Sequence, residues 1–234
     1  MKQNKKPSWL NPTMYKKISF AQSGEDLIIS SIFWALWTEK FTYLDIGAYH
    51  PFHFSNTAIF YQKGCRGINI EPDPTFYKLF LESRPLDINL NIGIGPEAGI
   101  LDFYIMSKPT LNTFSEEEVK EFEKEGIKTK QTIRVRVETI QSVLQEYWDG
   151  KSPDFLTVDA EGLDYEILES IDFEKIRPTV ICIETISYSR TGKGIKNNQI
   201  ISYLKKKGYL LYADTNINSI FVDKKTWESK RARG

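Results

Sequence analysis

The stretch FTYLDIGAYHP, residues 41–51, decides the fold, because it combines a short apolar strand with an acid and a glycine turn. Residues 41–46 are aromatic, β-branched or aliphatic except for Asp45, which is typical of a strand buried on both faces. Gly47 follows without a Cβ, so the backbone there can pass close to a ligand. We therefore expect a buried strand at 41–46 with a binding loop at its carboxyl end.

Strands and helices alternate outward from this stretch. The patterns predict helices beginning near Ser23 and at 73–82, 139–148, 163–171 and 199–207. They predict further strands at 67–71, 88–94, 100–105, 133–137, 155–159 and 180–186, and an antiparallel pair at 209–214 and 219–222. This alternation indicates an α/β fold whose sheet is mainly parallel and covered by helices on both faces.

The length of 234 residues suits one domain. We interpret residues 1–18 as an N-terminal extension, 19–224 as the domain and 225–234 as a basic, solvated tail. Within the domain, residues 106–131 become strongly charged, which indicates an inserted surface helix that could serve as a lid.

Composition excludes several classes of function. Lys and Arg together number 31, as do Asp and Glu, so no overall charge favours nucleic acid. The sequence has no apolar run of the roughly 20 residues that cross a bilayer and no signal-peptide pattern at its start, so we predict a cytoplasmic protein without a transmembrane segment. Cys65 and Cys182 lie in apolar runs and are expected to be buried thiols. The sequence does not indicate an oligomeric state.

Acidic residues end four of the predicted buried strands. These residues are Asp45, Glu71, Asp159 and Glu184. Because ligands of parallel α/β sheets bind at the carboxyl ends of the strands, we expect the four acids to converge on one rim.

The loop after the first strand does not have the three glycines that cradle a pyrophosphate. An acid beside a single glycine turn, as at Asp45 and Gly47, suits the ammonium and sulfonium groups of S-adenosylmethionine better than it suits phosphates. Glu71 lies 26 residues after Asp45 and ends the second strand, where an acid accepts hydrogen bonds from ribose hydroxyls in nucleoside-binding sheets.

Several motifs follow one another in order, namely AQSGED at 21–26, LDIGAYHP at 44–51, SNT at 55–57, residues 67–72, and DAEG at 159–162. Together they resemble the FkbM family of S-adenosylmethionine-dependent methyltransferases, and the resemblance covers about residues 19–222. It implies the class I methyltransferase fold, a Rossmann-like, mostly parallel seven-stranded sheet. It also implies methyl transfer mostly to hydroxyls of sugars or natural products, so the expected partner is a small-molecule or glycan acceptor.

The expected cofactor-binding residues follow from the motifs and from the family. They are Gln22, Gly24, Glu25, Asp26, Asp45, Gly47, Ala48, Tyr49, Glu71, Pro72, Asn112 and Thr113. The acids in this set that begin a helix are explained equally well by the helix dipole.

The expected catalytic residues are Asp159, Glu161 and Glu184. An alcohol attacks a sulfonium methyl as its proton leaves, so Asp159 or Glu161 could act as general base. Glu184 could be a second base, orient the acceptor, or hold Mg²⁺ together with Asp159. Nothing else in the sequence supports a divalent metal, and we predict no metal site.

Expected acceptor-binding residues lie in two loops, at His50 and His53 and at Tyr188 and Arg190. Purely structural roles remain open for both histidines, as does a solvated position for Arg190. Two other functions also remain: a nucleotide-dependent oxidoreductase, disfavoured by the missing glycine fingerprint, and a binding module without chemistry.

Overall fold

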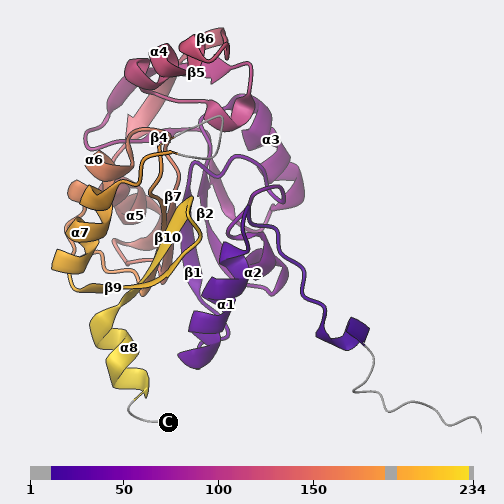
Figure 1. The fold of residues 1–234 in the computed structure, drawn as a ribbon, viewed down its shortest axis with the longest axis vertical. Coiled ribbons are helices and arrows are strands. Elements are labelled where there is room, and N and C mark those ends of the chain that lie inside the picture. The colour runs from indigo at the N-terminus through magenta and orange to yellow at the C-terminus, as the bar shows by residue number, and fades with distance from the viewer. Residues whose placement is uncertain (1–11, 188–193, 232–234) are drawn as a thin grey trace, which may run out of the picture.

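A twisted seven-stranded sheet forms the centre of the molecule (Figure 1). The computed structural model describes residues 12–187 and 194–231. In spatial order the strands are β3 (Ile88–Leu90), β2 (Arg66–Ile70), β1 (Thr42–Ile46), β7 (Phe155–Val158), β8 (Val180–Glu184), β10 (Asn218–Asp223) and β9 (Tyr209–Asp214). Neighbours from β3 to β8 run parallel, and β10 is antiparallel to β8 and β9. The predicted fold, including its antiparallel C-terminal pair, is confirmed.

Helices cover both faces of this sheet, because side chains alternate along each buried strand. Leu44 and Ile46 of β1 pack with α5, α6 and α7, whereas Tyr43 packs on the other face with α1, α2 and the partly buried Trp227 of α8. The helices are α1 (Glu25–Ala35), α2 (Ala58–Gln62), α3 (Pro74–Ser83), α5 (Ile140–Trp148), α6 (Asp164–Glu169), α7 (Asn198–Lys206) and α8 (Lys224–Arg231), with a 3-10 turn η2 (Pro12–Tyr15).

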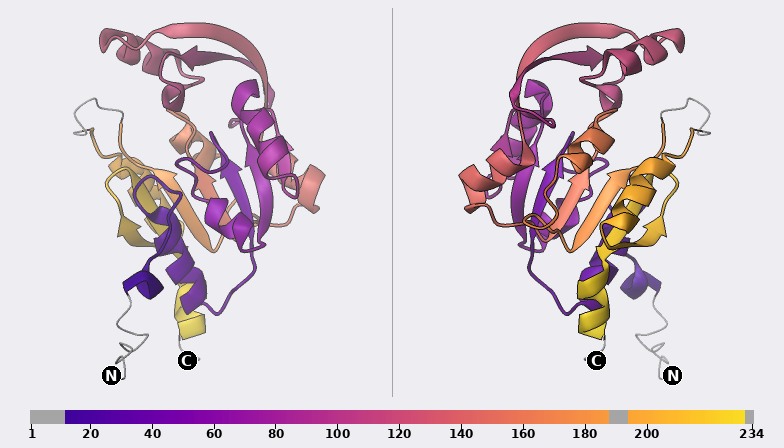
Figure 2. Two further views of the ribbon diagram at one scale, coloured as in Figure 1. Left: turned by 90° about the vertical axis from the view of Figure 1, so that its right-hand side faces the viewer. Right: turned by 90° about the vertical axis from the view of Figure 1, so that its left-hand side faces the viewer.

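A second sheet of three strands stands above the carboxyl ends of the first (Figure 2). It consists of β4 (Gly93–Ile94), β6 (Thr129–Glu138) and β5 (Gly99–Met106), in that order, with η3 (Pro109–Leu111) and α4 (Glu116–Lys124) between β5 and β6. We call β5, η3, α4 and β6 the arm. The long antiparallel pairing of β5 with β6 makes it a continuous ribbon.

One sequence-based prediction needs correction. The strand expected at 88–94 is broken into β3 and β4, which belong to different sheets. Residues 225–231 of the expected basic tail lie in α8, where most side chains are exposed and Trp227 packs against the core. No helix in the described ranges is long and apolar enough to span a bilayer.

Gly67 marks the tightest packing between β1 and β2. A Cβ at this position would overlap both the ring and the carbonyl oxygen of Tyr43, which is fully buried. Gly99 in β5 is a contrasting case, since a Cβ there would meet no atom within 4 Å.

We expect Gly67→Ala to lower the free energy of unfolding by about 1–3 kcal/mol, the usual cost of overpacking a core. Gly99→Ala is the matched control and should change stability by less than about 0.5 kcal/mol. Urea denaturation followed by circular dichroism measures both. Equal stability of the two variants would contradict the packing described at β1 and β2.

Candidate functional site

A cavity of about 500 Å³ opens at the carboxyl ends of β1, β2, β7 and β8, beneath the arm. This volume lies within the range of small-molecule and cofactor sites. Of the residues predicted from sequence, those that line it are Gln22, Gly47, Tyr49, Glu71, Pro72, Asn112, Asp159, Glu161 and Glu184. The predicted convergence on one rim is therefore found for Glu71, Asp159 and Glu184.

The loop after β1 is fixed at the end of two neighbouring strands. The backbone N–H groups of Gly47 and Ala48 both donate to the carbonyl of Ile70, the last residue of β2. On the other side, a Cβ on Gly47 would overlap the carbonyl oxygen of Asp159. With its φ of 72°, Gly47 occupies a conformation and a space that other residues do not tolerate.

Glu71 holds the turn that follows β2. Its carboxylate accepts hydrogen bonds from the N–H of Tyr49 at 2.6 Å and from the N–H of Asp73 at 2.7 Å. Burial raises the pKa of Glu71 to about 8, although these two hydrogen bonds oppose the shift. Asn112 from the arm joins this wall of the cavity by donating to Asp73 at 3.0 Å.

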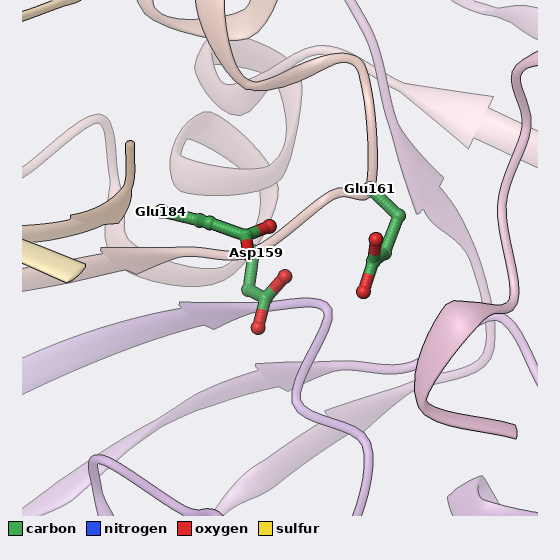
Figure 3. Close-up of side chains that lie close together, drawn as sticks. All are labelled: Asp159, Glu161 and Glu184. Atoms are coloured by element: carbon green, nitrogen blue, oxygen red, sulfur yellow. The ribbon is translucent and has the colours of Figure 1, made fainter. Parts of the chain in front are cut away.

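Three carboxylates come together at the ends of β7 and β8 (Figure 3). Asp159 directly follows β7, Glu161 lies two residues later in the same loop, and Glu184 ends β8. One oxygen of each lies within 4.8 Å of the others. We call these residues the acid cluster. Because an oxygen-only set also suits Mg²⁺, these residues would hold a divalent cation if one bound, and the absence of a metal stays a prediction.

The acid cluster favours protonated carboxyl groups. Burial raises the pKa of Asp159 to about 7, and the charge of Asp164 adds to this shift. Burial also raises the pKa of Glu161 and of Glu184, with a further contribution from neighbouring carboxylates in the cluster. The side chain of Asp159 nevertheless opens into the cavity, where it is accessible to solvent and to a ligand.

Several predicted cofactor residues lie outside the lining of this cavity. Asp45 is buried beneath the loop and accepts a hydrogen bond from the hydroxyl of Thr57 at 2.6 Å. Gly24 is the N-cap of α1 in a left-handed conformation, and Glu25 and Asp26 are fully buried in the first turn. Glu25 accepts hydrogen bonds from Thr215 and Asn218, and Asp26 from Ser19 and Phe20. These hydrogen bonds give Asp45, Glu25 and Asp26 a structural role.

Thr113, Ala48 and the two histidines also lie outside the lining. Thr113 is fully buried and donates its hydroxyl proton to the carbonyl of Glu161 at 2.6 Å, so it contacts the acid cluster through the backbone. Nδ1 of His50 accepts hydrogen bonds from the N–H groups of Phe52 and His53, which shape the loop. Tyr188 and Arg190 lie outside the described residues.

Other residues that line the cavity were not predicted from the sequence, because no motif marks them as binding residues. The arm and the turn between β9 and β10 contribute several of them, namely Phe103, Lys108, Phe114, Asn216 and Asn218. Asn56 lines the cavity as well, and its amide donates to Thr157 at 3.1 Å. It lies in the SNT motif, which was the one available signal.

Comparison with known protein families agrees with this arrangement. The profile of the methyltransferase FkbM domain matches residues 45–211, which include the loop after β1, Glu71 and the acid cluster. The chain belongs to the FkbM methyltransferase family. No curated protein matches the chain.

Two solved structures are similar to this FkbM-family chain at low identity. The crystal structure of methyltransferase FkbM from Methylobacillus flagellatus KT is 14% identical, with a TM-score of 0.46, over 79% of this chain and 44% of that one. The precorrin-6y C5,15-methyltransferase from Geobacter metallireducens GS-15 is 12% identical, with a TM-score of 0.38, over 84% and 87% of the two chains. The present chain thus spans less than half of the first structure.

The raised pKa of Asp159 predicts how stability depends on pH. The native state holds this proton more tightly than the unfolded chain, so stability falls as the pH rises from about 4 towards 7. Asp159→Asn removes the charge while keeping the shape. We expect this variant to melt about 2–4 °C above the parent at pH 8, and above it by a clearly smaller margin at pH 5, where only part of the loss of stability has occurred. Thermal denaturation without ligand measures the difference.

Glu97→Gln, in the exposed turn before β5, is the matched control and should change melting little at either pH. A similar effect of Asp159→Asn at pH 5 and pH 8 would contradict a raised pKa at this position.

Proposed function

We propose that this chain is an S-adenosylmethionine-dependent methyltransferase that methylates a hydroxyl group of a sugar, glycan or other metabolite. The observation that carries the proposal is that one cavity is lined both by Glu71, after β2, and by the acid cluster, after β7 and at the end of β8, with β1 between them. These residues lie within the matched FkbM domain. In this proposal Glu71 binds the nucleoside of the donor, and the acid cluster takes the proton of the acceptor.

The residues at the ends of β1 and β2 fit the methyl donor. Glu71 retains acceptor capacity beyond its two backbone hydrogen bonds, which suits the ribose hydroxyls. The loop at Gly47 presents backbone without a Cβ, and Gln22 also lines the cavity. Among the described lining residues, four carboxyl groups face one lysine, Lys108. The donor's ammonium and sulfonium groups would favour the ionised form of these acids, whose pKa values burial raises, and would be held by that form.

For methyl transfer the protein has to position the donor and the acceptor and to supply a general base. When bound, the donor supplies an electrophilic methyl on sulfur. A bond forms from the acceptor oxygen to this methyl as the sulfur–carbon bond breaks, and the hydroxyl proton passes to a carboxylate. Asp159 and Glu161 are the proposed bases, and Glu184 orients the acceptor or takes the proton in their place. A pKa of about 7 suits Asp159 for this work near neutral pH.

The wall beside the acid cluster suits a neutral, hydroxyl-bearing acceptor. Ile186 and Ile217, near the end of β8, offer apolar surface. Asn216 and Asn218 offer amide groups, and Asn218 pairs with Glu184 in the sheet. Carboxyl groups form hydrogen bonds with hydroxyls in either protonation state, whereas an acceptor carrying phosphate would be repelled by those that are ionised.

Binding of the donor product tests the first half of the proposal. Isothermal calorimetry should detect S-adenosylhomocysteine binding, and no binding of NAD. An analogue without ribose hydroxyls should bind the parent about tenfold or more weakly, and this difference should vanish in Glu71→Ala. Binding of NAD alone, or no binding of either ligand, would rule out the proposed donor.

Single substitutions in the acid cluster test the second half. Asp159→Asn, Glu161→Gln and Glu184→Gln are each assayed with labelled donor and a panel of mono- and oligosaccharides, with products identified by mass spectrometry. Loss of the base should lower kcat by about 10²–10⁴-fold. Affinity for S-adenosylhomocysteine should stay within about threefold of the parent. If all three variants keep full turnover, the carboxylates are not bases.

A further inference from the structure

Two tryptophans protrude at the end of the molecule opposite the arm. Trp34 lies near the end of α1 and Trp37 follows the helix, and their side chains are 77% and 81% exposed. Their rings stack on each other with centroids 6.4 Å apart. Indoles of this size are rarely left so open to water, and an exposed aromatic pair is a sign of an interaction surface.

Exposed lysines surround this pair. The ammonium of Lys63 donates to Ser30 in the middle of α1, and that of Lys40 donates to the carbonyl of Lys63. Lys230 reaches from α8 to the carbonyl of Leu36 at 3.2 Å, which joins α8 to the end of α1. All three lysines are hydrogen-bonded to neutral oxygens rather than to carboxylates.

Helix α8 extends the same charge. Lys224 and Lys225 are exposed at its beginning, and Figures 1 and 2 both show α8 beside α1 at this end. The acids of the segments involved are Glu39 and Glu228, and Glu228 is paired with Lys224 at 3.9 Å. Five lysines against two acids leave a positive surface, although the whole chain has no net charge.

We propose that this end of α1 and α8 docks on the surface of an anionic lipid membrane. Indoles settle at the level of lipid headgroups, where one part of the ring is in contact with apolar chains and the N–H stays hydrated. Lysines around them contact anionic headgroups and keep their stems on apolar surface. This combination of protruding aromatic rings and an excess of lysines over carboxylates is the chemistry of an interfacial anchor.

The shape of the surface favours a membrane over a protein partner. Both indoles project outward, so a folded partner would need a matching pocket for each, whereas a headgroup layer admits them without one. Docking here would leave the cavity free, because it opens at the opposite ends of the strands (Figure 2). The inference therefore does not depend on which methyl acceptor the cavity binds.

Vesicle flotation with the full chain tests the proposal. The probes are phosphatidylcholine vesicles with and without about one third phosphatidylglycerol. We expect the fraction bound to the anionic vesicles to be about tenfold higher, to fall with added salt, and to be accompanied by a blue shift of tryptophan emission. The double variant Trp34→Gln, Trp37→Asn should lower binding by about tenfold or more. These replacements respect the helix at residue 34 and the positive φ of 55° at residue 37.

Two control variants distinguish binding through this surface from non-specific adsorption to vesicles. Ile100→Thr with Leu101→Thr removes exposed apolar side chains from β5 in the arm, and should leave vesicle binding unchanged. Lys225→Gln with Lys230→Gln should reduce both the binding and its dependence on salt. Both double variants, and the tryptophan variant, should keep the affinity of the parent for S-adenosylhomocysteine.

Three results would overturn the proposal. One is absence of parent binding to the anionic vesicles. Another is an equal loss of binding in the tryptophan and β5 variants. The third is tryptophan-dependent self-association, seen by sedimentation without any lipid binding, which would assign this surface to a second copy of the chain.

Discussion

The contact between Gly47 and Asp159 is the constraint on which the site depends. Strands β1 and β7 lie in register up to Ile46 and Val158, and the N–H of Asp159 extends the ladder by donating to Ile46 at 3.0 Å. The loop after β1 must then cross the carbonyl of Asp159, and only a residue without a Cβ fits there. The proposed donor loop and the acid cluster are therefore one packed unit through their backbones, so a backbone shift in either one moves the other.

A buried polar network supports this unit from below. Arg84 is fully buried and donates to four groups, which are the carbonyl of Pro51 and the side chains of Ser55, Thr57 and Asn69. Thr57 in turn donates to Asp45. Burying a guanidinium costs desolvation free energy, which hydrogen bonds to its N–H groups offset. Here the two terminal nitrogens make four hydrogen bonds, and Nε has no hydrogen-bond partner. The network thus ties the loop to the sheet at a real cost in desolvation. Asp45 serves the loop through this network, without facing the cavity.

Local patterns were enough to predict the parallel sheet, the turn at Gly47 and the acids at the strand ends, because each rests on residues close in sequence. Arg84 could not be predicted, since its sequence context is that of an exposed helix end and its partners lie 15 to 33 residues away. The second sheet was missed for a similar reason. Alternation at 133–137 predicts a strand, but nothing local says which sheet the strand joins. Asn216 and Asn218 reach the cavity only through the antiparallel return of β10.

The arm supports the backbone of the loop that carries Glu161. Glu161 has a φ of 41° and is followed by Gly162 at 94°, a conformation that costs a non-glycine residue about 1–3 kcal/mol. Such a backbone persists only where its surroundings hold it. The hydroxyl of Thr113 donates to the carbonyl of Glu161, and Ser115 and Glu118 of the arm pack against Gly162. The charged insertion therefore stabilises the loop that carries Glu161, and the geometry of the acid cluster depends on a segment remote from it in sequence.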